Sequence, residues 1–282
     1  MTGTVPIPDP DSVATLIDAA LTEDVGRGDL TSQAVLPADA RLKFALTTRQ
    51  DIVPAGMDVA AQIFKRLAPQ ASVDILVTDG TPVVAGTVLM LLDGPARGLL
   101  TAERSALNLL QFLSGIATTT RAYVDEITGT GAVLLDTRKT VPGLRALSKY
   151  ATVVGGATNH RMRLDDGVLI KDNHIAVAGS VGEAVRRAQA AGLESIEVEC
   201  DTLDQVEEAL GAGIGRLLLD NMTNEHLRKA VEMAAGKATL EASGGVDLQT
   251  IRAIAKTGVD FISVGRITQS APAVDIGLDQ QT

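Results

Sequence analysis

The side chains that could do chemistry gather in one basic segment, residues 136–174. This segment holds seven Lys and Arg side chains against four Asp, whereas the whole 282-residue chain has a formal net charge of −10. Cations concentrated inside an acidic protein are suited to a small anion that the overall field would repel. Arg presents a planar fork that grips a carboxylate at two points, and Lys supplies a point charge. The segment therefore predicts a binding site for a substrate with more than one carboxylate.

Two short apolar runs in this segment end in polar clusters. The run at 133–135 is followed by Asp136, Thr137, Arg138 and Lys139, and the run at 168–170 is followed by Lys171. Each run is typical of a buried strand, and ligands of parallel α/β folds bind at the carboxyl ends of strands. The alternative is a set of solvated loop charges. Two clusters, with His160 and Arg161 between them, favour ligand contact.

Later strand ends change from cationic to acidic and then to glycine-rich. They carry Glu199, Asp220, Ser243-Gly244-Gly245 and Gly265-Arg266. The two carboxylates could hold Mg²⁺, which prefers oxygen ligands, or they could stabilise a cationic, oxocarbenium-like sugar. Each glycine-rich stretch precedes a predicted helix, and helix N-termini favour phosphate. The last two strand ends of barrels are a common phosphate site, which favours that role over an ordinary turn.

Short apolar strands alternate with helices from residue 133 onward, and this βα repeat indicates a parallel sheet. Strands are predicted at 133–136, 168–171, 195–199, 216–220, 239–242 and 261–264, with a possible seventh at 150–154. Helices are predicted at 181–191, 203–210, 224–235 and 248–256. An open sheet and a barrel share this periodicity. Polar residues recur at nearly every strand end, as they would around one mouth, and this favours a barrel.

The first hundred residues indicate a mixed α+β unit. A helix capped by Ser12, a strand at 42–46, a helix at 57–67 and strands at 73–77 and 83–92 are predicted. We therefore predict an α+β sandwich domain over 1–100 and an α/β barrel domain over 101–265 that holds the active site. A C-terminal segment, 266–282, is predicted to pack back toward the first domain. Arg104 lies in the first turn of a predicted helix, where a cation opposes the helix dipole, so it is either a solvated charge or aimed at an anion.

The composition excludes several classes of protein. Aromatic residues make up 2% of the chain and the net charge is negative, which argues against nucleic-acid binding. The first twelve residues lack the charged start and apolar centre of a signal peptide, and no apolar run approaches the roughly 18 residues of a membrane span. The single cysteine, Cys200, excludes an intramolecular disulfide and is predicted to pack under a helix. We therefore expect a cytoplasmic protein with no membrane partner.

Several of these residues stand in motifs that resemble one known family. DTRKT-x-PGLR at 136–145, NHR at 159–161 and LIKDNH at 169–174 resemble nicotinate-nucleotide pyrophosphorylase, also called quinolinate phosphoribosyltransferase. The similarity covers nearly the whole chain, and it includes the motifs at 196–199, 219–222, 241–245 and 263–265. Each motif alone is weak, but all of them in this order are highly specific.

The resemblance implies an incomplete α/β barrel preceded by a smaller α+β sandwich domain. It implies a type II phosphoribosyltransferase that converts quinolinate and phosphoribosyl pyrophosphate (PRPP) to nicotinate mononucleotide, CO₂ and pyrophosphate in de novo NAD biosynthesis. Mg²⁺ would be the cofactor. The assembly would be a homodimer in which Arg104 reaches the neighbouring subunit's site, and this would account for a cation that its own helix does not favour.

By matching motif, the resemblance also implies roles for individual residues. Lys139, Glu199 and Asp220 would be catalytic, and the two carboxylates would also serve the metal. Quinolinate would be bound by Arg104, Thr137, Arg138, Lys139, His160, Arg161 and Lys171. Ribose and phosphate would be bound by Glu199, Asp220, Ser243, Gly244, Gly245, Val264, Gly265 and Arg266. His174 matches the motif without an implied role. The sequence departs from the family after Gly265, where Arg266 could add a phosphate contact and Gln269 cannot supply a charge.

Two alternatives stay open at this point. A nicotinate phosphoribosyltransferase, or the paralogue linked to molybdenum transport operons, belongs to the same superfamily. The full set of cations at Arg138, Lys139, His160, Arg161 and Lys171 argues instead for a dicarboxylate. A non-catalytic anion-binding protein on the same scaffold would have lost the carboxylates on the metal side, whereas Glu199 and Asp220 are both present.

Overall fold

The computed structural model describes residues 8–281 and divides into two compact units, each with its own apolar core. The second unit comprises Ala122–Thr140 and Gly156–Gln269, and the first comprises the other described residues. The division falls inside a single helix, α4 (Ala96–Ile127), between Arg121 and Ala122. The prediction that there is no signal peptide rests on the first twelve residues, and residues 1–7 of these lie outside the described part.

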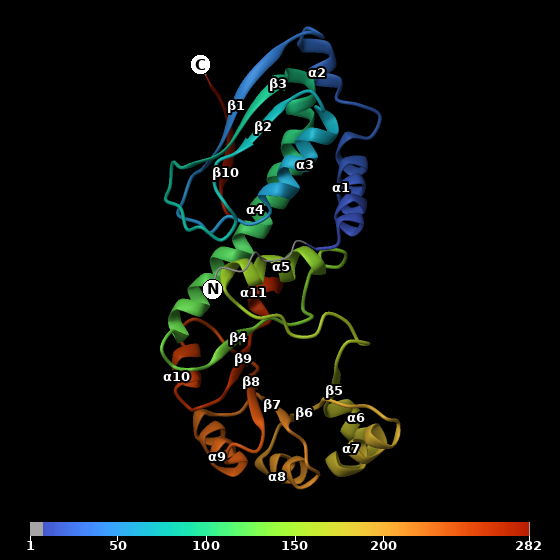
Figure 1. The fold of residues 1–282 in the computed structure, drawn as a ribbon, viewed down its shortest axis with the longest axis vertical. Helices are drawn as coiled ribbons and strands as arrows, with labels where there is room; N and C mark the ends of the chain where they lie inside the picture. The colour runs from blue at the N-terminus through green and yellow to red at the C-terminus, as the bar shows by residue number, and fades with distance from the viewer. Residues whose placement is uncertain (1–7, 282) are drawn as a thin grey trace. The chain divides into compact units, whose positions relative to one another are not determined.

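The first unit is built on an antiparallel sheet with the strand order β10-β1-β3-β2 (Figure 1). Its strands are β1 (Arg41–Thr48), β2 (Ser72–Ile75), β3 (Val88–Pro95) and β10 (Ile276–Gln280). Leu46 of β1 lies opposite Met90 of β3 on one side and Leu278 of β10 on the other. The last strand of the chain therefore completes the sheet of the first unit.

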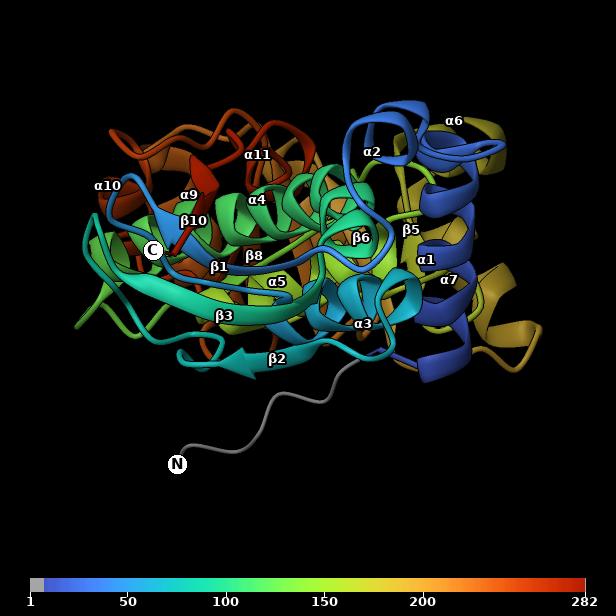
Figure 2. The same ribbon diagram turned by 90° about the horizontal axis from the view of Figure 1, so that it is seen from above.

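The helices of the first unit present apolar stripes at helical spacing. They are α1 (Pro10–Val25), α2 (Leu30–Val35), α3 (Met57–Leu67), the first part of α4, and α5 (Arg145–Gly155). On α1 the buried stripe is Val13, Ile17 and Leu21, and Figure 2 shows α1 beside α3. The predicted Ser12 cap is wrong because the helix begins earlier: the Asp9 carboxylate accepts from the Ser12 N–H at 3.0 Å.

The possible strand at 150–154 is also wrong, since these residues form the second half of α5. The β-branched run Thr152-Val153-Val154 suggests a strand. However, the buried side chains Leu147, Ala151 and Val154 follow helical spacing, and burial of that stripe in the first unit's core outweighs the local preference.

The second unit is a six-stranded parallel sheet with the order β4-β9-β8-β7-β6-β5. Its strands are β4 (Val133–Leu135), β5 (Val168–Ile170), β6 (Ile196–Cys200), β7 (Arg216–Asp220), β8 (Thr239–Ser243) and β9 (Phe261–Ser263). The six firmly predicted strands are all present, and their ends shift by at most one residue. Because β4 and β5 are not paired to each other among the described strands, the barrel is incomplete, as expected.

Helices follow the strands and lie along the outer side of this sheet, as Figure 1 shows for α7 to α10. They are α6 (Asp172–Ala178), α7 (Val181–Ala190), α8 (Leu203–Gly211), α9 (Asn224–Ala234), α10 (Ile251–Ala255) and α11 (Arg266–Gln269). Within residues 8–281, no helix combines the length and apolarity needed to cross a lipid bilayer.

Strand β6 shows how the sequence pattern separates the two faces of the sheet. Ile196, Val198 and Cys200 belong to the apolar core of the second unit, while Glu197 and Glu199 alternate with them. Successive side chains of a strand point to opposite faces, so both Glu side chains lie on the face away from that core. The predicted burial of Cys200 is confirmed: its side chain is fully buried.

Candidate active site

The parallel strands bring their carboxyl ends to one edge of the second unit. Asp220 at the end of β7 lies opposite Ser243 at the end of β8, and Leu135 of β4 lies opposite Ser263 of β9. In α/β barrels this edge carries the active site. Except for Arg104, the residues predicted for the site all belong to this unit, on or directly after its strands or in the loop that precedes β5.

A buried carboxylate anchors the loop that carries His160. Asp136, directly after β4, is fully buried and accepts from the Asn159 side-chain amide at 2.9 Å and from the His160 backbone N–H at 2.8 Å. The backbone of β4 also pairs with Thr158. These bonds hold the segment Asn159-His160-Arg161 beside the end of β4, although it lies more than twenty residues further along the chain.

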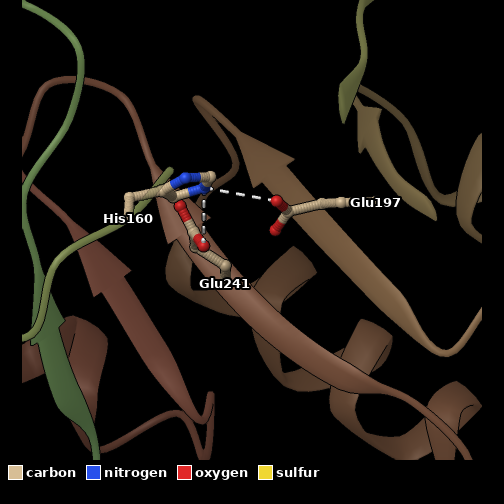
Figure 3. Close-up of side chains that lie close together, drawn as sticks. All are labelled: His160, Glu197 and Glu241. Atoms are coloured by element: carbon tan, nitrogen blue, oxygen red, sulfur yellow. Dashed lines mark ion pairs between the residues drawn. The ribbon is translucent and has the colours of Figure 1, made fainter. Parts of the chain in front are cut away.

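Both ring nitrogens of His160 are engaged within the protein. Nδ1 accepts from the backbone N–H of Arg161 at 2.7 Å. Nε2 lies 3.2 Å from a carboxylate oxygen of Glu197 and 3.5 Å from one of Glu241, as Figure 3 shows. In a neutral imidazole one nitrogen accepts and the other donates, so the hydrogen-bond pattern assigns the proton to Nε2. This ring points toward the carboxylates of β6 and β8.

The partners of His160 form a buried network that the sequence reasoning missed. Glu197 and Glu241 are 4% and 0% exposed. Arg216, at the start of β7, donates from Nε to Glu197 at 2.8 Å and from Nη2 to Glu241 at 2.9 Å. A signal was present, because Glu197 stands two residues before Glu199 and a strand places both side chains on one face.

The two buried carboxyls of this network differ in pKa. Burial alone would raise the pKa of Glu197, but hydrogen bonds and electrostatic interactions with His160 and Arg216 lower it below its ordinary value. Burial raises the pKa of Glu241, and repulsion from Glu197 raises it further. Glu241 is therefore the carboxyl of the pair that takes up a proton first as the pH falls.

Arg161 is affected by the charge of a second predicted cation, Arg138. Its Nη1 donates to the Gly167 carbonyl at 2.8 Å. Burial lowers the pKa of Arg161, and the nearby positive charge of Arg138 lowers it further, whereas Glu197 and Asp166 oppose the shift. The structure thus brings two of the predicted carboxylate-binding side chains together, at the cost of mutual repulsion that an anion would relieve.

Lys139 is fixed by contacts with the last strand end. Its backbone N–H donates to the Thr137 hydroxyl at 3.0 Å, and its carbonyl accepts from the Thr268 hydroxyl at 2.7 Å. A Cβ atom on Gly265 would lie 2.8 Å from Cδ of Lys139, so the lysine side chain passes close to the end of β9, where glycine leaves room for it. Val264 donates its backbone N–H to Leu135 at 3.0 Å, which ties the same strand end to β4.

The acidic residues of the predicted site form a second cluster. Lys171 makes an ion pair with Glu199, which is 6% exposed. Burial raises the pKa of Asp220, repulsion from Glu199 and Asp201 raises it further, and Lys171 and Lys139 oppose the shift. The negative charge here is only partly compensated by protein cations. The structure therefore brings both predicted carboxylates and two predicted lysines into one group.

The glycines after β8 adopt backbone conformations that favour glycine. Gly244 and Gly245 have φ angles of +91° and +62°, and a Cβ atom on Gly244 would collide with Asn221. The helix predicted at 248–256 is present but begins three residues later, since α10 spans Ile251–Ala255. Asp247 explains the delay: its carboxylate accepts from the backbone of Gln249 and Thr250, each at 2.9 Å, and forms a turn.

His174 has a local structural role. Its ring Nδ1 accepts from the Lys171 backbone N–H at 2.9 Å, and its backbone N–H donates to the Lys171 carbonyl at 2.8 Å. This reciprocal pair closes the first turn of α6 and places Lys171 at the end of β5. The remaining predicted residue, Arg104, is exposed on α4 in the first unit.

Two consecutive parts of the chain match the two domain models of one family. The model of the quinolinate phosphoribosyl transferase N-terminal domain matches residues 29–114, and the model of its C-terminal domain matches residues 116–279. The chain is 44% identical over 276 residues to nicotinate-nucleotide pyrophosphorylase (carboxylating) of Mycobacterium leprae, covering 95% of this chain and 97% of the relative. It is 38% identical over 288 residues to a mitochondrial quinolinate phosphoribosyltransferase (decarboxylating) of Nicotiana glauca, covering 95% and 82%.

Solved structures give the same result. The nicotinate-nucleotide pyrophosphorylase of Francisella tularensis superposes with a TM-score of 0.93 at 40% identity and covers 100% of both chains. The protein of the same name from Ehrlichia chaffeensis has a TM-score of 0.92 at 42% identity and covers 95% of this chain and 98% of the other.

Proposed function

The chain belongs to the quinolinate phosphoribosyltransferase family, and from that premise we propose that it converts quinolinate and PRPP to nicotinate mononucleotide, CO₂ and pyrophosphate. This reaction would serve de novo NAD biosynthesis. One observation supports the proposal. At one edge of the sheet, a group of cations lies together with a cluster of carboxylates whose negative charge is only partly compensated by protein cations. A dicarboxylate fits the first group, and an activated sugar that develops positive charge fits the second.

The cations Arg138, Lys139, Arg161 and Lys171 would bind the two carboxylates of quinolinate. The positive charge of Arg138 lowers the pKa of the partly buried Arg161, and a dianion between the two side chains would offset that repulsion. Thr137 would support this group through its bond to the backbone of Lys139. A direct contact of His160 with the substrate is left out of the proposal, because both of its ring nitrogens have partners in the protein.

Glu199 and Asp220 would act on the ribose and the metal. Mg²⁺ fits this pair, since it prefers oxygen ligands and completes its shell with phosphate and water, and a cation would relieve the repulsion that raises the pKa of Asp220. When bound, Mg²⁺ would supply charge stabilisation to the pyrophosphate. The backbone of Ser243, Gly244 and Gly245 and that of Val264 and Gly265, with the Arg266 side chain, would hold phosphate.

The chemistry requires two steps that this arrangement could support. The ring nitrogen of quinolinate attacks the anomeric carbon of PRPP while the bond to pyrophosphate breaks, and Glu199 and Asp220 stabilise the positive charge that develops on the ribose. The resulting pyridinium then accepts the electron pair of the adjacent carboxylate bond as CO₂ leaves, and a proton replaces CO₂ on the ring carbon. Lys139 lies close to Gly265 and its charge acts on Asp220, which supports a role for it beside the carboxylate cluster.

We extend the proposal to a homodimer in which Arg104 contributes to the partner's site. Its support is the exposure of this side chain on α4. The prediction that Arg104 lies in the first turn of its helix is wrong, because α4 begins at Ala96, and the helix-dipole argument therefore does not apply. A cytoplasmic location stays a prediction, supported by the bacterial relatives.

The release of CO₂ from carboxyl-labelled quinolinate tests the proposal most directly. We expect labelled CO₂ and nicotinate mononucleotide only when PRPP and Mg²⁺ are both present. Nicotinate in place of quinolinate serves as the matched substrate. Faster turnover of nicotinate would favour the related phosphoribosyltransferase, and quinolinate binding without pyrophosphate release would favour a non-catalytic anion-binding protein.

A further inference from the structure

A chain of polar contacts runs through the interior face of the second unit's sheet, from the start of β7 to the loop at residues 159–161. It passes from Arg216 to the carboxylates of Glu197 and Glu241, and then to Nε2 of His160. Figure 3 shows the imidazole directed at both carboxylates. None of the steps attributed to the active site uses Glu197, Glu241 or Arg216, so this buried charged group needs an explanation of its own.

We propose that His160 is a positioning residue: Glu197, Glu241 and Arg216 lock its ring, and the locked ring holds the backbone of Arg161 for the substrate. This inference rests on the proposed function only where it refers to quinolinate. It assigns to His160 no contact with the substrate, and it adds Glu197, Glu241 and Arg216 as residues on which the substrate site depends.

The hydrogen-bond directions support this assignment. The backbone N–H of Arg161 can only donate, so Nδ1 of His160 must carry a lone pair at this contact of 2.7 Å. The proton is then on Nε2, which lies 3.2 Å from a carboxylate oxygen of Glu197 and 3.5 Å from one of Glu241. A ring held at both nitrogens in this way has one orientation. With only one of the two carboxylates, the ring would have more freedom to rotate. Arg216 holds both carboxylates in place.

The same directions argue against a metal ion at this cluster. His160, Glu197 and Glu241 do place three ligand atoms within 4.8 Å of one another. A metal would need a bare Nε2, which would move the proton to Nδ1. The N–H groups of His160 and Arg161 would then face each other across 2.7 Å. In addition, Arg216 already compensates the carboxylates that would attract the ion.

Arg161 is the residue that the network would position. Its backbone is held by His160, and its guanidinium is held by the Gly167 carbonyl at 2.8 Å. The backbone of His160 is itself held by Asp136 at 2.8 Å. A side chain that is fixed at both ends loses little freedom when a carboxylate binds, and displacement of a binding group by about 1 Å can cost about a hundredfold in rate. Supporting contacts of this kind set the geometry of a site.

Nitrogen-15 NMR of the histidine rings tests the locked tautomer without any reaction. The chain has only three histidines, and the spectrum of His160→Gln identifies the signals of His160 by their absence. At pH 8 we expect a proton on Nε2 and a bare Nδ1 in the free protein, unchanged by saturating quinolinate. A proton on Nδ1, or a ring that changes its pattern when quinolinate is added, would overturn the proposal.

Steady-state kinetics of Glu241→Gln test the consequence for the substrate. We expect the KM for quinolinate to rise about tenfold and the KM for PRPP to stay within about twofold, because the network supports only the cationic group. The effects of Glu241→Gln and His160→Gln should be far from additive, since both act through one ring. Glu225→Gln, at an exposed ion pair on α9, is the matched control and should change neither KM.

Additive effects, or equal rises in both KM values, would refute the positioning role. If Glu241→Gln does not fold, Arg216→Lys replaces it, because it keeps a charge but loses the two-point grip on both carboxylates. Failure of the proposed function would look different: the wild-type protein would not turn over quinolinate, while the NMR result for the free protein would still decide the state of His160.

Discussion

Two glutamates on one strand have opposite environments. Glu197 and Glu199 stand two residues apart on β6, on the same face, and both are nearly buried. Glu197 contacts Arg216 and His160 and has a lowered pKa. Glu199 lies at the strand end, in a cluster with Asp220 and Asp201 where repulsion contributes to the raised pKa of Asp220. The interior group is compensated by the protein, whereas the group at the rim, formed by Glu199, Asp201 and Asp220, is compensated only in part by Lys171 and Lys139.

This difference distinguishes residues that support the site from residues that take part in the reaction. Buried ions are tolerated when partners and hydrogen bonds replace water, and the interior network satisfies this condition through Arg216 and His160. The rim keeps an excess of negative charge. This charge destabilises the folded protein unless a bound ligand neutralises it. Substitutions at the rim should therefore reduce activity more than stability, and substitutions in the interior should reduce stability and positioning.

Replacement of Lys139 by Ala should have the largest effect on the rim. The variant loses a cation that acts on Asp220, so we expect kcat for quinolinate to fall about a thousandfold while thermal unfolding stays unchanged. The measurement is turnover together with a melting curve. Lys43→Ala, at an exposed lysine in the first unit, is the control. Near-normal turnover of Lys139→Ala would remove this residue from the mechanism.

Asp220→Asn should reduce activity yet stabilise the fold. We expect kcat to fall about a hundredfold and Tm at pH 7 to rise by about 2 °C. The pKa of Asp220 is raised in the folded state, so the folded protein holds this proton to higher pH than the unfolded chain. Stability must then fall as pH rises from the ordinary Asp range through the raised pKa.

The variant lacks this titrating group, so the corresponding fall should be absent from its curve of unfolding free energy against pH. Glu225→Gln, at an exposed carboxylate, is again the control. A lower Tm for Asp220→Asn at pH 7 would contradict the view that the rim stores unrelieved repulsion.

Arg216→Met should show the reverse behaviour, with the loss in stability. The change leaves Glu197 and Glu241 buried without their shared cation. We expect the free energy of unfolding to fall by about 2 kcal/mol, below the range for fully buried pairs because the Arg216 side chain is 38% exposed. Denaturant unfolding measures this. Arg186→Met, at an exposed pair on α7, should have no measurable effect, and equal stability of both variants would refute the distinction.

Cys200 should show the smallest effect, because it lies on the opposite face of β6. Burial raises the pKa of its thiol to about 12, so at pH 8 the thiol is protonated and covered. A thiol reagent should give no detectable reaction with the native protein and one thiol per chain after denaturation. Glu207→Cys, on the exposed side of α8, is the control and should add one fast-reacting thiol. Rapid labelling of Cys200 in the wild type would show that this face opens.

Local patterns in the sequence predicted much of the fold and the membership of the site. The alternation of short apolar strands with helices predicted the parallel sheet, and polar residues at strand ends predicted which side chains meet. Glu197 and Glu241 were missed because a carboxylate inside a strand has no local signal for its partner. Arg216 lies nineteen residues from one of these carboxylates and twenty-five from the other.

By itself, then, the sequence determined the periodicity of the elements, the charge of the site and the family of the chain. Periodicity depends on neighbours within a few residues, so it can be read along the chain. Tertiary structure alone decided that the imidazole of His160 turns toward Glu197 and Glu241. It also decided that α5 is a helix, because burial of a stripe in a distant core outweighs a local β preference. The orientation of a side chain depends on donors and acceptors that only folding brings within hydrogen-bond distance.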